Sequence, residues 1–213
     1  MSGHCCQNQP KFEGMSAGFK RALWLVIAIN GVMFIVEMIA GRIGQSQALQ
    51  ADALDFFADT ITYSLSLFVI GMSLKVRSLV ALLKGISLAG MGLWIFGSTV
   101  YHVFIPGVPQ AEVMGVIGFM ALLANVISVL LLLHYRDGDA NVRSVWLCSR
   151  NDAIGNVAVI LAGSGVWVTS QAWPDLIVAI LMAGLFLWSS AQILHLVYVE
   201  SRHADESAPE SRP

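Results

Sequence analysis

The chain has 213 residues, of which 56% are hydrophobic and 12% are charged, and its mean hydropathy is +0.71. A soluble domain is far less apolar, so the composition indicates a protein whose solvent is the lipid bilayer. The formal net charge of −2 offers no broad basic surface for nucleic acid. Three cysteines without an even framework of spaced pairs argue against structural disulfides.

Six stretches are each long and apolar enough to cross a bilayer as a helix, which takes roughly 20 residues. Short connections rich in Gly, Pro or charged residues separate them. We therefore predict an all-α membrane protein with an N-terminal tail at 1–20, a six-helix transmembrane domain at 21–199 and a disordered C-terminal tail at 200–213. No soluble C-terminal domain is expected. The predicted helices are 22–40, 48–73, 79–101, 113–134, 143–168 and 176–199.

The basic residues predict the orientation of these helices. If the N-terminus is cytoplasmic, every Lys and Arg except Arg42 and Arg150 falls on an inner segment or near an inner helix end. Six crossings then place both termini in the cytoplasm. The first 20 residues lack the apolar core and cleavage site of a signal peptide, so we expect a multi-pass protein of the bacterial inner (cytoplasmic) membrane.

The second and fifth predicted helices differ from the others because they carry charge at membrane depth, where an isolated charge costs several kcal/mol. Asp55 and Asp59 are four residues apart and share one helix face. Cys148 and Asp152 repeat that spacing. An antiparallel pairing of the two helices would set Asp55 near Asp152 and Asp59 near Cys148. We predict that these four side chains bind a divalent metal ion.

This ligand set suggests both a metal and a mechanism. Four ligands of this kind suit a tetrahedral ion such as Zn²⁺. Crowded carboxylates repel one another and hold protons unless a cation replaces them, so metal entry should expel protons and allow metal/proton exchange. A membrane metalloenzyme is a weaker alternative, because four ligands close the shell and no hydrolase motif is present. A metal sensor or a structural subunit is a third interpretation.

The two motifs resemble the cation diffusion facilitator family of metal/proton antiporters. They are residues 49–59 (LQADALDFFAD) and 141–152 (NVRSVWLCSRND), and the resemblance covers about residues 21–199. It implies an exporter of divalent transition-metal ions that places ligands at Asp55, Asp59, Cys148 and Asp152. The family usually has His where Cys148 stands, and a thiolate favours zinc, cadmium or other thiophilic ions. No cofactor beyond the transported ion is expected.

Other polar residues on these helices allow two interpretations each. Asp52 shares the face of Asp55 one turn nearer the outside, where it would line the exit path or hydrogen-bond a neighbouring helix. Asn151 and Asn156 would support the ligands or make ordinary interhelical hydrogen bonds. We expect Glu37, on the first helix, to stabilise packing rather than bind metal.

Two further clusters each allow two interpretations. His4, Cys5 and Cys6 form a soft-ligand cluster in the N-terminal tail, either for metal capture or by chance. Small residues at 85, 89 and 92 form one smooth face of the third predicted helix. That face suits a homodimer contact through the membrane helices or an intramolecular contact.

Overall fold

The computed structural model describes residues 16–69, 74–104, 107–135 and 140–206. Within these residues the fold is six long α-helices and one 3₁₀ turn, Leu133–Tyr135, without a β-strand. The all-α prediction is confirmed. The helices are α1 (Ala17–Ile43), α2 (Gln47–Val69), α3 (Leu74–Phe104), α4 (Ala111–Leu132), α5 (Ala140–Thr169) and α6 (Trp173–Glu206).

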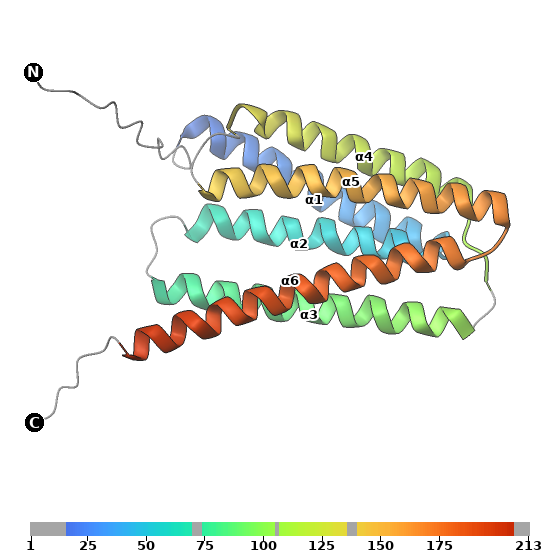
Figure 1. Cartoon of the computed structure of the whole chain (residues 1–213). Coiled ribbons are helices and arrows are strands. Elements are labelled where there is room, and N and C mark those ends of the chain that lie inside the picture. Colours follow the sequence, from blue (N-terminus) through green and yellow to red (C-terminus); the bar gives the residue numbers. More distant parts are fainter. Residues whose placement is uncertain (1–15, 70–73, 105–106, 136–139, 207–213) are drawn as a thin grey trace, which may run out of the picture.

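The six helices form one elongated bundle in which successive helices run in opposite directions (Figure 1). The start of α1 and the end of α6 lie at the same end of the bundle, as an even number of crossings requires. The main packing pairs are α3 with α6, α4 with α5, and α1 with α2. α2 contacts each of the other five helices. Of its aspartates, Asp52 is buried, and Asp55 and Asp59 are partly buried.

Five of the helices are long and apolar enough to cross a membrane, judged by length and composition. α2 falls outside this group because three aspartates interrupt its apolar sequence, yet it lies antiparallel to α1 within the same bundle (Figure 1). The outward surface is apolar: Leu93, Trp94, Leu185 and Trp188 are each more than 60% exposed. The five apolar spans are Ala17–Ile43, Leu79–Phe104, Ala111–Tyr135, Ser149–Thr169 and Trp173–Val199.

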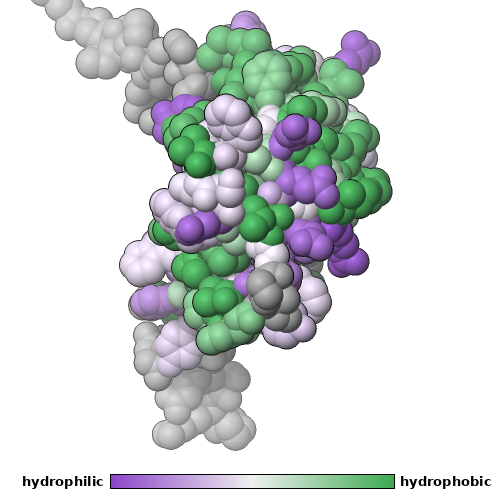
Figure 2. Space-filling view, turned by 90° about the vertical axis from the view of Figure 1, so that its right-hand side faces the viewer, coloured by the Kyte–Doolittle hydropathy of each residue, from purple (hydrophilic) through white to green (hydrophobic). Residues whose placement is uncertain are grey.

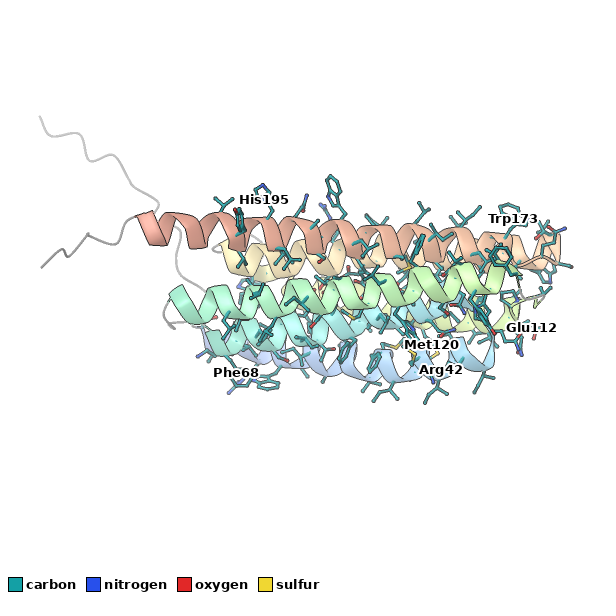
Figure 3. All side chains as sticks on the ribbon, turned by 90° about the horizontal axis from the view of Figure 1, so that it is seen from below. Arg42, Phe68, Glu112, Met120, Trp173 and His195 are labelled. Atoms are coloured by element: carbon teal, nitrogen blue, oxygen red, sulfur yellow. The ribbon has the colours of Figure 1, made fainter. Side chains whose placement is uncertain are left out.

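The end of the bundle that carries the α1–α2 and α5–α6 turns has a different surface. Figure 2 shows this end facing the viewer, with hydrophilic residues mostly to the right of its centre and hydrophobic residues between and around them. Arg42, Glu112 and Trp173 lie at this end, and Phe68 and His195 lie toward the opposite one (Figure 3). A polar end above apolar sides is the pattern that a bilayer imposes on a spanning bundle.

Two helix limits differ from the expected domain boundaries. α1 begins at Ala17, where the Ser16 hydroxyl accepts a hydrogen bond from the Phe19 N–H at 3.1 Å. This serine caps the helix several residues before the expected boundary at residue 21. At the other end, α6 continues to Glu206, beyond the expected boundary at residue 199.

The small-residue face of α3 packs within the chain. A Cβ added at Gly85 would lie 2.9 Å from Leu194 Cδ2, and one added at Gly92 would lie 2.9 Å from Leu187 Cγ, both on α6. The Ser190 hydroxyl of α6 also donates to the Gly85 carbonyl at 2.7 Å. Of the two interpretations of this face, the structure shows the intramolecular contact.

Candidate metal site

α2 is anchored at its N-terminus by a carboxylate from α6. Asp175, in the first turn of α6, is fully buried and accepts hydrogen bonds from Ser46 Oγ at 2.6 Å, Gln47 N at 2.8 Å and Ala48 N at 3.1 Å. Ser46 Oγ in turn accepts from Leu49 N at 3.0 Å. The first N–H groups of a helix have no partner within it, so an anionic acceptor is stabilising there. Asp175 thereby fixes the position of α2 against α6.

From this anchor α2 extends into the bundle and presents Asp55 and Asp59 toward α5. The Asp152 carboxyl of α5 lies within hydrogen-bonding range of the carboxyls of both Asp55 and Asp59. The structure therefore brings together three of the four predicted ligands. They come from two helices, because the antiparallel pairing places the middle of α2 beside the first half of α5.

The fourth predicted ligand, Cys148, lies on α5 one turn before Asp152, but its side chain is outside the described residues. Among the side chains that are described, no group of three or more His, Cys, Asp or Glu is arranged to hold a metal ion. The three carboxyls adjoin one another without enclosing a coordination position. His4, Cys5 and Cys6 also lie outside the described residues.

Two residues not singled out from the sequence adjoin the carboxyls. The Tyr63 hydroxyl, on a fully buried side chain, lies within hydrogen-bonding range of Asp59 and 3.4 Å from Ser149 Oγ of α5. The charge of Lys84, inside α3, acts on both Asp55 and Asp59. Tyr63 lies four residues after Asp59, a spacing that could have indicated its place. The sequence pattern places Lys84 near an inner helix end, and only the packing of α3 brings its charge near Asp55 and Asp59.

The other polar residues of α2 and α5 differ in exposure. Asp52 is 2% exposed and faces Glu37 of α1, which is fully buried. Asn156 is also fully buried. Asn151 is exposed on α5 and accepts a hydrogen bond from Arg150 Nη2 at 3.3 Å. The interior of the bundle thus holds Asp52 and Asn156, while Asn151 lies at its surface.

Comparison with known proteins identifies the family of the chain. The family described as the cation efflux transmembrane domain matches residues 23–196. The metal cation efflux system protein CzcD of Cupriavidus metallidurans is 27% identical over 191 residues, which cover 83% of this chain and 60% of the relative. The zinc transporter ZitB of Escherichia coli is 27% identical over 187 residues, 82% of this chain and 60% of the relative.

A third relative is the cadmium, cobalt and zinc/H(+)-K(+) antiporter of Bacillus subtilis, 25% identical over 181 residues, which cover 78% of this chain and 58% of the relative. The chain spans about 60% of the length of these relatives. Their names are those of transporters rather than enzymes. The apolar helices and the family match together make this chain a multi-pass protein of the inner membrane. It belongs to the cation efflux family, the cation diffusion facilitators.

Proposed function

We propose that the chain exports divalent transition-metal ions from the cytoplasm in exchange for protons, through a site formed by Asp55, Asp59, Cys148 and Asp152. The observation that carries this proposal is the meeting of three carboxyls from α2 and α5 inside a bundle of the cation efflux family. Ionisable groups at this depth are costly and mark ion pathways. A cation that neutralises them offsets that cost.

The ligand chemistry supports a zinc-like substrate. Carboxylate oxygens and a thiolate together suit Zn²⁺ and also accommodate Cd²⁺ or Co²⁺. Two of the relatives above carry names that include zinc, cadmium or cobalt, in agreement with this range. Cys148 sets the preference, because a sulfur ligand favours thiophilic ions over Mg²⁺ or Ca²⁺.

Proton exchange follows from the shortage of positive charge around the site. Among the described residues, Lys84 is the basic group whose charge acts on Asp55 and Asp59. Three carboxyls facing one cation favour retained protons when no metal is bound, and a divalent ion replaces those protons on binding. Protons that enter from outside then release the metal outward. One relative is itself named a metal/H(+)-K(+) antiporter.

Reconstituted liposomes test this function directly. Purified protein should drive Zn²⁺ and Cd²⁺ flux that rises with an imposed pH gradient, measured with a metal-sensitive dye and with a pH dye in parallel. Asp59→Asn and Asp152→Asn should each reduce flux at least about ten-fold, because each removes one ligand charge. Glu112→Gln, an exposed acid at the bundle end (Figure 3), is the matched control. Flux that ignores the pH gradient would exclude proton exchange.

Substitution at position 148 separates the metal preference from the transport itself. Cys148→Ser replaces the sulfur with a hydroxyl and should weaken Cd²⁺ transport more than Zn²⁺ transport, since Cd²⁺ is the more thiophilic ion. Cys148→His supplies a nitrogen ligand and should restore Zn²⁺ flux. If Cys148→Ser left both ions unaffected, Cys148 would not be a ligand and the site would consist of the three carboxylates.

A further inference from the structure

A second pair of acidic side chains lies in the bundle beside the candidate metal site. Glu37 of α1 is fully buried and Asp52 of α2 is 2% exposed, and their carboxyls are close enough to interact. Neither oxygen of Glu37 nor Oδ2 of Asp52 makes a hydrogen bond of good geometry within the described part of the chain. Buried polar atoms are nearly always satisfied, yet apart from the opposing carboxyl these three oxygens have no hydrogen-bond partner in that part of the chain.

The register of α1 against α2 places this pair one turn from the metal site. Gly41 packs on Leu49 and Gln50, and Gly31 packs on Thr60, so Glu37 lies opposite the stretch that contains Asp52 and Asp55. The charge of Asp55 also acts on Glu37. Asp52 precedes Asp55 toward the end where α1 turns into α2 (Figure 1). The pair therefore lies between Asp55 and that end of the bundle.

α5 contributes a third polar side chain in the same direction. Asn156 is four residues after Asp152 on α5, which runs antiparallel to α2. Asn156 therefore lies one helical turn from Asp152, toward the end of the bundle at which Asp52 also lies. It is fully buried, and neither its amide oxygen nor its amide nitrogen has a hydrogen-bond partner among the described residues. Amide and carboxylate oxygens are the ligands that hard and borderline divalent cations accept.

The electrostatics of the pair differ from those of the metal site. Lys84 acts on Asp55 and Asp59, but the groups that act on Glu37 and Asp52 are acidic. Two carboxyls in an apolar bundle require compensation from protons or from a cation. A cation that has left the neighbouring aspartates would meet oxygen ligands here, without a competing positive side chain among the described residues.

We propose that Glu37 and Asp52, together with the Asn156 amide oxygen, form a second position for the divalent cation, which the ion occupies after leaving Asp55, Asp59 and Asp152. This inference rests on the proposed transport function. The two positions are used in turn rather than together, because two divalent ions one helical turn apart repel strongly in a medium of low dielectric constant. The ligands of the second position are all oxygens, whereas those of the first include the Cys148 sulfur.

Cobalt binding to the purified full chain distinguishes the two positions by their spectra. Wild-type protein should bind Co²⁺ with a thiolate-to-metal absorption band, which reports the first position. In Asp59→Asn/Asp152→Asn the first position is disabled, and Co²⁺ should bind more weakly and without that band. Adding Glu37→Gln to this double variant should weaken the remaining binding at least about ten-fold, while adding Glu112→Gln should not. Circular dichroism and gel filtration establish that each variant is folded.

The outcomes separate the two proposals. If the folded Asp59→Asn/Asp152→Asn variant binds no Co²⁺, or binds it equally well after Glu37→Gln, the second position is excluded even though wild type transports metal. If wild type neither binds nor transports a divalent ion, the proposed function itself fails. In liposomes, Glu37→Gln alone should lower the maximal flux at least about ten-fold with less than a three-fold change in Co²⁺ affinity. An unchanged maximal flux would contradict a position on the path.

Discussion

Removal of the Asp175 carboxylate should detach the N-terminus of α2 from α6. Asp175→Ala leaves the buried N–H groups of Gln47 and Ala48 without the acceptor that they have at 2.8 and 3.1 Å, and removes the 2.6 Å bond from Ser46. Each stranded buried donor costs about 1–3 kcal/mol. Partial relaxation of the helix end reduces the sum, so we expect a loss of about 3–5 kcal/mol in the free energy of unfolding.

A graded series tests this magnitude. Asp175→Asn retains one acceptor oxygen and should lose roughly half as much. Ser46→Ala removes one hydroxyl donor and also the acceptor of the Leu49 N–H, and should lose about 1–2 kcal/mol. Unfolding of the purified chain in mixed micelles by a denaturing detergent can be followed by the fluorescence of its six tryptophans. Glu112→Gln, an exposed acid at the same end (Figure 3), should match wild type.

The losses in unfolding free energy of these variants, compared with one another, test whether Asp175 anchors α2. If Asp175→Ala unfolds within about 0.5 kcal/mol of wild type, the size of a typical surface substitution, then Asp175 does not anchor α2. If Asp175→Ala costs no more than Ser46→Ala, the Gln47 and Ala48 bonds to the carboxylate together stabilise no more than the single Leu49 bond to Ser46, which contradicts the expected order. Because α2 carries Asp55 and Asp59, Asp175→Ala should also weaken metal binding, which the same preparation can report.

Three further substitutions test the surroundings of the site and the bundle packing. Tyr63→Phe removes the hydroxyl beside Asp59. Zn²⁺ affinity in equilibrium dialysis should fall about ten-fold, because a group that supports a metal ligand is lost. Unchanged affinity would show that Tyr63 does not support Asp59 as a ligand. Lys84→Met removes a positive charge that acts on Asp55 and Asp59, so Zn²⁺ should bind up to about ten-fold more tightly and leave more slowly; weaker binding would contradict repulsion by Lys84. Gly92→Leu places a Cβ 3.2 Å from the Ala183 carbonyl oxygen and should lower the free energy of unfolding in detergent by about 1–3 kcal/mol. Gly97→Leu, where a Cβ meets nothing within 4 Å, should lower it less. Equal losses in the two variants would refute tight α3–α6 packing.

The sequence alone was sufficient to predict the helices, because twenty-residue apolar stretches have few alternatives in a bilayer. Each predicted stretch corresponds to one helix of the bundle, although α1 begins at Ala17 and α6 continues to Glu206. These limits depend on local capping and on helix propensity beyond the apolar core, which hydropathy does not report. The Ser16 cap of α1 is one such local cause.

The aspartates of α2 were also identifiable from the sequence, because a charge at membrane depth is costly and its spacing assigns it to a helix face. That pattern predicted the proximity of Asp55 to Asp152, and the structure places Asp152 against both Asp55 and Asp59. Spacing on one helix could not identify partners from other helices. Lys84 and Asp175 act on α2 across the bundle, and periodicity holds no information about which helix packs on which.

The sequence by itself thus determined the membrane class, the helices and the acidic faces, because these follow from transfer free energy and from the helical repeat. Only the tertiary structure decided which side chains meet: Asp175 at the α2 N-terminus, Lys84 beside Asp55 and Asp59, and Glu37 facing Asp52. Glu37 illustrates the difference, since a buried acid on α1 has a role in ion passage only if α2 places a second carboxyl opposite it. That juxtaposition depends on the register of two helices, which close contacts such as Gly41 on Gln50 determine.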